Sequence, residues 1–426
     1  MAISSREFSD GMWFANAAKF SGTIVATMIA IDDAQAMIRA ESRPNPSQAV
    51  TMNEALGCIL AQSVVSDVDS PPHDKALMDG YAVRASDIAQ DVELEIIEEV
   101  VAGEVPTRPV ESGTATRIMT GAPLPQGADA VVMVERTEMV AEDRVRFLLE
   151  SIDSGTAVMR RGASVRRNQV VLQPGCELRS IEVGAMAEVG CAAVDVIRPP
   201  EIALVQTGDE LVEIGNHLQP GQIRNSNGPM LSAMVQQVGG RAVDLGIARD
   251  DEAMLTAKIR QGLKSDLLLL SGGVSAGVRD LVPAVLVAAG VRQVFHKVNM
   301  RPGKPLWFGV ADRADQGRCL VFGLPGNPVS GLACFWVFVA PAILIASGRT
   351  GQMTIETRPL AESHRLGGAR PTYWPAVQEG EDGVRALPWQ GSADLCSLAS
   401  ADSLIFFPEG GREYLAGEAV AVLPLR

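Results

Sequence analysis

The distribution of apolar and polar residues changes character along the chain. From Glu201 onward, short apolar runs that end in polar turns alternate with longer amphipathic runs. The clearest short run is residues 267–270, four leucines followed by the turn Ser271-Gly272-Gly273. Such a run is typical of a strand buried on both faces of a parallel sheet. The alternation predicts a doubly wound, three-layer α/β/α domain over residues 200–348.

Five strands and four helices are expected in this domain. The predicted strands are residues 202–206, 243–248, 267–270, 291–300 and 319–325. The predicted helices are residues 230–240, 252–264, 281–290 and 329–348, with Asn227 as the N-cap of the first.

In the flanking segments the apolar runs between turns are shorter, and valine, glycine and proline are more frequent. Residues 31–41 and 52–61 predict two helices, residues 91–150 a small β-rich lobe, and residues 155–198 short β elements. Strand-like runs after residue 350 predict a C-terminal β-barrel. The expected division is as follows: 1–28, an N-terminal extension; 29–70 with 150–199, a discontinuous linker domain; 71–149, the β-rich lobe; 200–348, the α/β domain; 349–426, the barrel.

Composition excludes several classes of function. The chain has 426 residues and a net charge of −14, which disfavours a nucleic-acid or anionic-membrane surface. Its six cysteines are scattered, so a structural zinc site has no support. The apolar run 23–31 is too short to span a bilayer, and no basic n-region precedes it. A cytoplasmic protein without membrane or nucleic-acid partners is expected.

The candidate chemistry lies in the loops of the α/β domain. Because ligands bind outside the carboxyl ends of parallel strands, these loops are expected to converge on one crevice. They supply the carboxylates Glu210, Asp250, Asp251 and Asp280, the cations Arg301 and Lys304, and the uncharged donors Ser271, Gly272, Gly273, Ser275 and Asn327. Each carboxylate taken alone is better explained as a helix N-cap, because acidic residues favour that position. Together, hard oxygen ligands, cations and backbone N–H groups suit Mg²⁺ and a phosphate or tetrahedral oxyanion.

These groups favour phosphoryl or oxyanion transfer with a divalent metal. The sequence has no P-loop, no HExxH motif and no nucleophile elbow with a histidine partner, which disfavours a serine hydrolase. In the β-rich lobe, the polar turns at 71–84 and 117–125 are candidates for either a site or ordinary turns.

Seven short motifs, in this order and spacing, resemble the molybdopterin molybdenumtransferases, or molybdenum insertases, of the bacterial MoeA type and the insertase domain of gephyrin. The motifs are MDGYAVR at 78–84, RIMTGAPLPQGADAVV at 117–132, TGDEL at 207–211, GQIRNSN at 221–227, SGGVSAGVRD at 271–280, PGKP at 302–305 and GLPGNPVS at 323–330. The resemblance covers nearly all of the chain from about residue 30 and implies a MogA-like, molybdopterin-binding α/β domain.

The resemblance implies transfer of molybdate to the dithiolene of adenylylated molybdopterin, with Mg²⁺ and release of AMP. It implies a homodimer whose cleft is shared between subunits, and contacts with the molybdopterin adenylyltransferase and recipient molybdoenzymes. The implied catalytic residues are Asp79, Thr120, Glu210, Asp251, Asp280 and Lys304, with Glu210, Asp251 and Asp280 as metal-associated groups. The implied substrate-binding residues are Ser271, Gly272, Gly273, Ser275, Arg301, Pro302, Gly303, Pro325, Gly326, Asn327, Pro328 and Ser397.

The chain departs from the family pattern at a few positions. Arg301 stands where lysine is common, Asn225 where aspartate is usual, and Lys75 within a motif that commonly reads DNSAMDGY; Ala163 and Ser164 replace an acidic pair. Two alternative functions stay open: the adenylyltransferase that precedes the insertase, and a non-catalytic binding or scaffold protein on the insertase fold.

Overall fold

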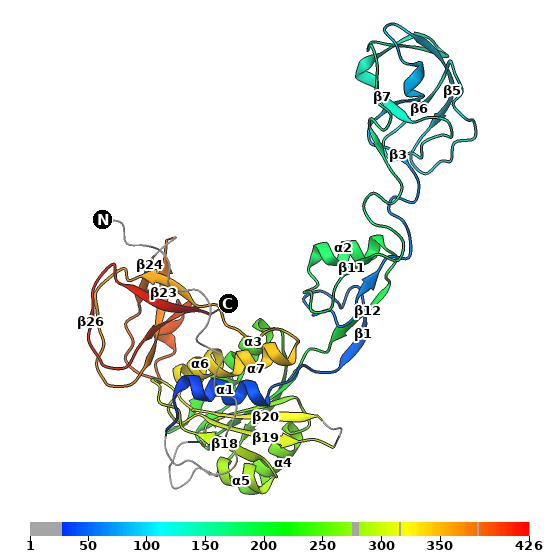
Figure 1. The fold of residues 1–426 in the computed structure, drawn as a ribbon. Coiled ribbons are helices and arrows are strands. Elements are labelled where there is room, and N and C mark those ends of the chain that lie inside the picture. Colours follow the sequence, from blue (N-terminus) through cyan, green and yellow to red (C-terminus); the bar gives the residue numbers. More distant parts are fainter. Residues whose placement is uncertain (1–27, 275–280, 315–316, 381–382, 426) are drawn as a thin grey trace. The chain divides into compact units, whose positions relative to one another are not determined.

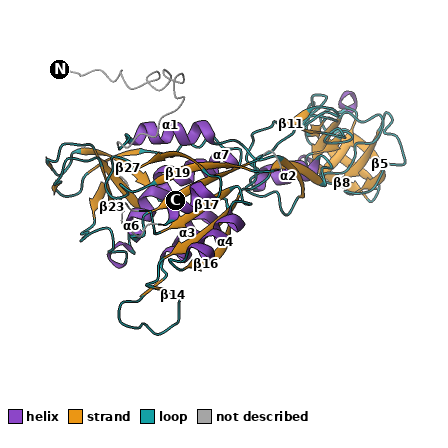
Figure 2. Cartoon of the chain, turned by 90° about the horizontal axis from the view of Figure 1, so that it is seen from below, coloured by secondary structure: helices purple, strands orange, loops and turns teal. Residues whose placement is uncertain are grey.

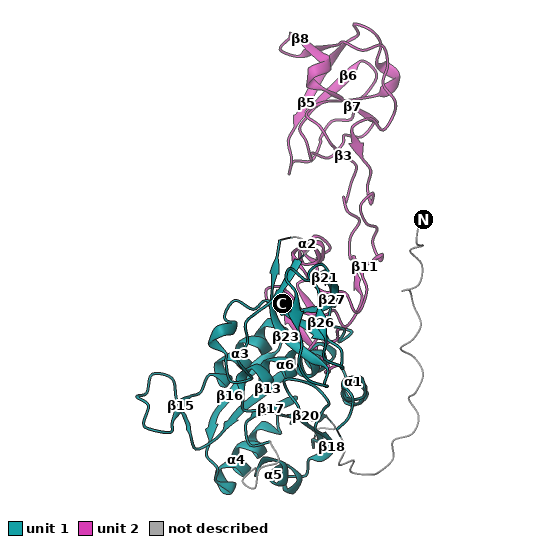
Figure 3. Ribbon diagram, turned by 90° about the vertical axis from the view of Figure 1, so that its left-hand side faces the viewer, with its two compact units in different colours: residues 1–43, 200–346, 350–426 teal, residues 44–199, 347–349 magenta. Residues whose placement is uncertain are grey.

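The computed structural model describes residues 28–274, 281–314, 317–380 and 383–425. The chain forms two compact units (Figure 3). The first comprises the described parts of residues 1–43, 200–346 and 350–426, and the second comprises residues 44–199 and 347–349.

The first unit contains a six-stranded sheet in the order β16-β13-β17-β20-β19-β18. Its strands are β13 (Glu201–Thr207), β16 (Arg241–Ala248), β17 (Leu267–Ser271), β18 (Arg292–His296), β19 (Trp307–Asp312) and β20 (Arg318–Leu324). The four strands β16, β13, β17 and β20 run parallel, whereas β19 is antiparallel to both of its neighbours.

Helices cover both faces of this sheet, which confirms the three-layer architecture (Figure 1). The helices are α1 (Ile31–Glu41), α3 (Asn227–Gln237), α4 (Glu252–Gly262), α5 (Val282–Ala288), α6 (Pro328–Cys334) and α7 (Ala340–Ala346). Alternate leucines of β17 face opposite cores: Leu267 and Leu269 pack with α1, α3, α6 and α7, and Leu268 and Leu270 with α4 and α5. The run of leucines is thus buried on both faces, as predicted.

Helices α6 and α7 are joined by a π-helical segment, Phe335–Val339, and form one continuous helix. Within the described residues, this helix, Pro328–Ala346, is long and apolar enough to cross a membrane, but most of it is buried in the unit's core. Burial of this kind is what a core helix of a large α/β domain shows.

The sequence missed one strand of the sheet and misplaced one helix cap. Strand β19 was not predicted, because its apolar run follows directly after the Pro302–Pro305 turn. The predicted cap Asn227 is wrong: the side chain that accepts a hydrogen bond from the first turn of α3 is Asn225, whose Oδ1 lies 3.0 Å from the Gly228 nitrogen.

The C-terminal part of the first unit is a small barrel, as predicted. A five-stranded sheet has the order β21-β27-β25-β23-β24, and a bridge between Leu360 and Val384 brings its two edges together. Its strands are β21 (Glu356–Pro359), β23 (Thr372–Glu379), β24 (Gly383–Ala386), β25 (Ser403–Phe407) and β27 (Ala419–Pro424), with β22 (His364–Arg365) and β26 (Glu413–Tyr414) paired beside them.

The second unit contains a six-stranded sheet in the order β7-β4-β6-β5-β9-β8. Its strands are β4 (Gly80–Val83), β5 (Glu93–Val100), β6 (Thr114–Ile118), β7 (Ala130–Met133), β8 (Thr137–Ala141) and β9 (Arg144–Phe147). The rest of the unit pairs β1 (Ser47–Thr51) with β12 (Ala193–Ile197), β2 (Val64–Val65) with β11 (Val170–Leu172) and β3 (Lys75–Ala76) with β10 (Val158–Met159), and carries helix α2 (Ser180–Glu188).

Local patterns were least informative in this unit. The helix predicted at 52–61 is wrong, because the Leu60 and Ala61 nitrogens donate to the carbonyl oxygens of Cys176 and Asp195, far away in sequence. Helix α2 was not expected among the short β elements. Helix α1 has the predicted bounds, but its buried residues pack in the core of the first unit.

Because β17 is buried on both faces, truncating one of its leucines is expected to lower the free energy of unfolding strongly. Leu269 is fully buried, so Leu269→Ala is expected to destabilise the first unit by roughly 2–5 kcal/mol. Val287→Ala on α5, where the side chain is 55% exposed, is expected to change stability by less than about 0.5 kcal/mol. Urea denaturation measures both; equal midpoints for the two variants would contradict this packing.

Candidate active site

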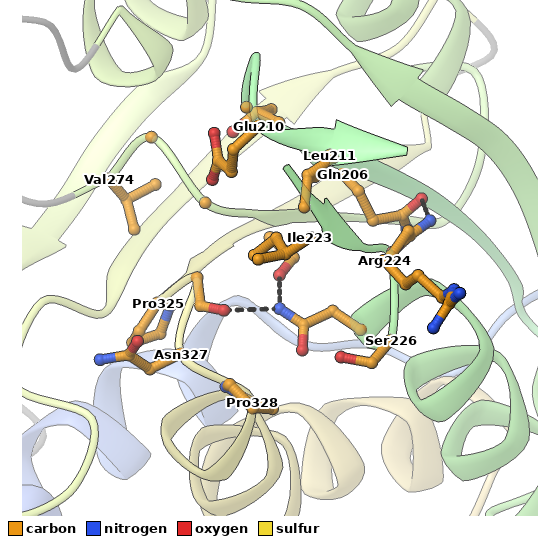
Figure 4. A pocket seen from close by; sticks show the side chains of 18 of the residues that line it. Gln206, Glu210, Leu211, Ile223, Arg224, Ser226, Val274, Pro325, Asn327 and Pro328 are labelled. Carbon is orange, nitrogen blue, oxygen red and sulfur yellow. Dashed lines mark hydrogen bonds between the residues drawn. The ribbon is translucent and has the colours of Figure 1, made fainter. Parts of the chain in front are cut away.

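A polar pocket of about 470 Å³ lies at the carboxyl edge of the sheet in the first unit (Figure 4). The loops that follow β13, β16, β17 and β20 all contribute to it, as predicted, and so does the start of α3. The lining residues are Gln206, Thr207, Gly208, Glu210, Leu211, Ile223, Arg224, Asn225, Ser226, Asn227, Asp250, Ser271, Gly272, Gly273, Val274, Pro305, Pro325, Gly326, Asn327 and Pro328.

The turn after β17 requires glycine at two positions. Gly272 and Gly273 have φ values of +100° and +65°, in the region that favours glycine. A Cβ on Gly272 would also come within 2.5 Å of the Thr207 carbonyl oxygen. The turn therefore lies directly against the end of β13, and its backbone is free of side chains on the pocket side.

Side-chain amides join three of the pocket's turns to one another. The Asn227 Nδ2 donates to the Ser271 Oγ at 2.7 Å and to the Gly326 carbonyl oxygen at 2.8 Å. The Asn327 Nδ2 donates to the Ser392 Oγ at 2.8 Å, which ties the turn after β20 to the C-terminal barrel. These bonds hold the pocket wall in one arrangement without a ligand.

Among the described residues, two carboxylates and one cation line the pocket. Glu210 and Asp250 are the carboxylates, and Arg224, which was not among the residues predicted from the sequence, is the cation. The neighbouring Asp251 instead accepts a hydrogen bond at 2.8 Å from the Met254 nitrogen as the N-cap of α4. Its predicted role in the reaction stays a prediction, but the structure places Asp250, rather than Asp251, in the pocket wall.

Two predicted site residues, Ser275 and Asp280, lie outside the described residues. The predicted metal group of Glu210, Asp251 and Asp280 is therefore not complete in the described part of the chain. No cluster of three or more histidine, cysteine, aspartate or glutamate residues that could hold a metal occurs among the residues described.

The predicted oxyanion contacts of the turn after β18 are mostly not part of the pocket. The Arg301 guanidinium lies beside the edge-to-face pair of Trp374 and Trp389, 6.0 and 5.6 Å from their ring centres, and its Nη1 donates to the Gly367 carbonyl oxygen. A guanidinium is well suited to such cation–π contacts. Pro302 and Gly303 are buried, Lys304 is exposed, and only Pro305 of this turn lines the pocket.

The remaining predicted residues lie elsewhere. Ser397 is exposed in the C-terminal barrel and does not line the pocket; the serine that contacts the pocket loop is Ser392. Asp79 and Thr120 belong to the second unit, where the Thr120 nitrogen and Oγ1 both donate to the Asp79 Oδ1 at 2.7 Å. These two hydrogen bonds lower the pKa of Asp79 and keep its carboxylate ionised.

Comparisons with known proteins agree with this architecture. Three family models match: the MoeA N-terminal region (domain I and II) at residues 29–190, a probable molybdopterin binding domain at 203–344, and the MoeA C-terminal region (domain IV) at 357–425. The pocket lies in the segment matched by the second model. The fold and these matches define a multidomain enzyme of molybdenum cofactor biosynthesis.

Individual relatives specify the family. The chain is 36% identical to a molybdopterin molybdenumtransferase of Nostoc sp., with 89% of each chain covered, and 33% identical to one of Haemophilus influenzae, with 93% and 98% covered. A crystal structure of a molybdopterin biosynthesis MoeA protein from Pyrococcus horikosii has a TM-score of 0.81 at 32% identity, covering 94% of this chain and all of that one. The chain belongs to the molybdopterin molybdenumtransferase family and is a transferase.

The close approach of Gly272 to β13 predicts a selective effect of adding one methyl group. Gly272→Ala places a Cβ against the Thr207 backbone and is expected to distort the pocket and abolish ligand binding. Gly290→Ala is the control, because Gly290 also has positive φ (+90°) but no atom within 4 Å of its Cβ position. Ligand binding that survives equally in both variants would contradict the required contact.

The hydrogen bonds of Asp79 predict a measurable pKa change. Because the folded-state pKa is lowered, the stability from this carboxylate is complete above its unfolded pKa and is lost as pH falls through the folded pKa. Thr120→Val removes the hydroxyl donor but keeps the backbone donor, so the pKa of Asp79 is expected to rise part of the way to its ordinary value. NMR titration of the carboxyl carbons measures the change.

A matched control is available in the same lobe. Thr107 donates through its hydroxyl and its nitrogen to Glu98 and lowers the pKa of that carboxyl. Thr107→Val is expected to raise the pKa of Glu98 and to leave Asp79 unchanged. An Asp79 pKa that does not move in a folded Thr120→Val variant would refute the assigned cause.

Proposed function

We propose that this protein transfers molybdate to the dithiolene of adenylylated molybdopterin and releases AMP, with the pocket at the edge of the β13–β17–β20 sheet as the substrate site. The observation that carries the proposal is the pocket itself. Among the described residues, a glycine turn without side chains, two carboxylates, one arginine and two buried side-chain amides converge in it. The substrate has a polar ring, phosphates and a nucleotide, and so presents matching groups.

The phosphates are assigned to Arg224 and to the glycine turn beyond Gly272, whose own nitrogen donates to the Leu324 carbonyl oxygen at 3.1 Å. Backbone N–H groups in turns with positive φ form concave sites that suit anions, and a guanidinium binds phosphate oxygens in pairs. Of the residues that the structure describes in this acidic chain, Arg224 is the cation that lines the pocket. This assignment gives the local positive charge that an anionic substrate requires.

Mg²⁺ is assigned to the carboxylate side of the pocket. Glu210 and Asp250 fit such an ion, because Mg²⁺ in proteins is often held by one or two carboxylates together with substrate phosphates and water. Bound there, the ion would neutralise charge on the phosphates as AMP leaves. The resemblance to the family adds Asp251 and Asp280 as metal-associated groups.

Molybdenum is assigned to the sulfurs of the substrate and not to a protein thiol. The cysteines Cys319 and Cys334 are buried in the cores, and burial raises the pKa of the Cys319 thiol to about 12. No cysteine is among the residues that line the pocket. Lys304, which is exposed beside Pro305, is proposed to attract the molybdate anion, with Arg301 and Ser397 as further contacts implied by the family.

We further propose a homodimer in which Asp79 and Thr120 complete the site from the second unit of the partner subunit. Their mutual hydrogen bonds keep an ionised carboxylate exposed on the surface of the β-rich lobe. The expected partners are the molybdopterin adenylyltransferase, which supplies the substrate, and molybdoenzymes, which receive the product. The proposed location is the cytoplasm.

The reaction is tested by AMP release from adenylylated molybdopterin, with and without molybdate and Mg²⁺. The wild-type protein is expected to release AMP only when both are present, while molybdenum appears on the dithiolene. Glu210→Gln is expected to lower the rate at least tenfold, because it removes one of two carboxylates from the pocket. AMP release that is independent of molybdate would contradict the proposed function.

The two possible roles of Asp251 predict different outcomes for two substitutions. Asp251→Ser removes the carboxylate but keeps an N-cap oxygen, whereas Asp251→Ala removes both. If the carboxylate takes part in the reaction, as the family resemblance implies, both variants lose AMP release. Asp251→Ala should also lower stability by about 1 kcal/mol relative to the serine variant. Full activity of the folded serine variant would restrict Asp251 to capping α4.

A further inference from the structure

Two buried side-chain amides lie at the inner wall of the pocket. Gln206, at the end of β13, is completely buried, and Asn225, just before α3, is 4% exposed. The Asn225 Nδ2 donates to the Gln206 Oε1 at 3.3 Å. Both residues line the pocket, and Figure 4 shows this contact on the side of Arg224.

The backbone determines which way both amides point. The Gly228 nitrogen donates to the Asn225 Oδ1 at 3.0 Å, so this oxygen is already engaged and the Asn225 nitrogen must face Gln206. Gln206 must therefore present its oxygen to Asn225. The pair is tightly packed, because a Cβ on Gly228 would lie 2.9 Å from the Asn225 Nδ2 and 3.1 Å from the Gln206 Oε1.

This arrangement leaves the Gln206 amide nitrogen without a hydrogen-bond partner. Its Nε2 is buried and makes no hydrogen bond in the described part of the chain. A buried donor of this kind is destabilising, and native structures contain few of them. Because Gln206 lines the pocket, a ligand atom is the simplest partner for this donor.

One other buried atom on the same face of the sheet, the Asn227 Oδ1, is also without a partner in the described structure. The buried Thr207 Oγ1 lies on the opposite face, because alternate residues of β13 face opposite cores. The Asn227 nitrogen is engaged by Ser271 and Gly326, so its oxygen remains as an acceptor. The wall thus offers a donor, the Gln206 Nε2, and an acceptor, the Asn227 Oδ1, which match a flat heterocycle with a carbonyl and an N–H on one edge.

We propose that Gln206 is a specificity-determining residue that donates from Nε2 to the ring carbonyl of the pterin, and that Asn225 is the positioning residue that sets this polarity. The inference rests on the proposed function, since it takes molybdopterin as the ligand. It goes further, because it assigns the ring of the substrate to the β13 side of the pocket and names the group that distinguishes a carbonyl from an amine there.

Asn225→Asp is predicted to replace the hydrogen-bond donor that Gln206 offers to the pocket with an acceptor. A carboxylate at position 225 still accepts from the Gly228 nitrogen but cannot donate to Gln206. The Gln206 amide must then turn to donate its Nε2 to the carboxylate, and its Oε1 takes the place of the donor in the pocket. An acceptor at this point disfavours a ring carbonyl and favours a ring amine.

The test is fluorescence titration with two pteridines: 2-amino-4-oxopteridine, which has a carbonyl at position 4 and an N–H at position 3, and 2,4-diaminopteridine, which has an amine at position 4 and an acceptor nitrogen at position 3. The wild-type protein is expected to prefer the 4-oxo compound by roughly tenfold, about the value of one neutral hydrogen bond. Asn225→Asp should abolish or invert this preference. Gln206→Met, which has similar length and no donor, should bind both compounds without preference. Thermal denaturation shows that each variant is folded.

The result that would overturn the proposal is an unchanged preference in folded Asn225→Asp and Gln206→Met variants. The same titrations with AMP and IMP distinguish the two halves of the substrate. A change of preference confined to this nucleotide pair would mean that the adenine contacts Gln206, and it would overturn the assignment to the pterin.

Failure of this inference is distinguishable from failure of the proposed function. A wild-type protein that releases AMP in the presence of molybdate, with the same pteridine preference in all variants, contradicts only the role of Gln206 and Asn225. A wild-type protein that neither binds the pteridines nor releases AMP contradicts the proposed function and this inference together.

Discussion

The site depends on the close approach of two neighbouring strand ends. The backbone of Gly272, at the end of β17, lies so near the Thr207 carbonyl oxygen that a Cβ would come within 2.5 Å of it. This contact is possible because β13 and β17 are adjacent and parallel, and because residue 272 has no side chain. The pocket wall is thus formed by backbone, and polar side chains of the adjacent loops reach it from both sides.

The C-terminal barrel stabilises the same pocket from outside the α/β sheet. Ser392 contacts the loop after β20 through Asn327, and its carbonyl oxygen accepts from the Val329 nitrogen at the start of the long core helix. Arg301 makes cation–π contacts with two tryptophans of the barrel. Asn327 and Arg301 were predicted to contact the substrate, but the partners observed for them are structural ones in the barrel.

The predictions from sequence succeeded where burial follows a local pattern. The run of leucines predicted the strand β17, and the amphipathic pattern of residues 31–41 predicted the helix α1. Both predictions were correct, because each pattern lies within a single element. The supposed helix at 52–61 failed because hydrogen bonds to residues 176 and 195 decide its conformation. The loop chemistry was predicted from strand order, which brought Glu210, Ser271 and Asn327 together correctly.

The parts of the site that sequence did not indicate depend on three-dimensional contacts. Gln206 appears in the sequence as the polar end of an apolar strand, and nothing local shows that its nitrogen is buried without a partner. The choice between Asp250 and Asp251 depends on which carboxylate caps α4, a difference of one residue at a helix start. Such distinctions can be made only when the orientation of each side chain is known.

A crystal structure of the protein with bound adenylylated molybdopterin tests the central claim most directly. The account predicts that the ligand occupies the pocket between Gln206 and the Gly272–Gly273 turn, with its phosphates near the backbone of that turn and near Arg224. A ligand bound elsewhere, with this pocket filled only by water, would contradict the assignment of the site.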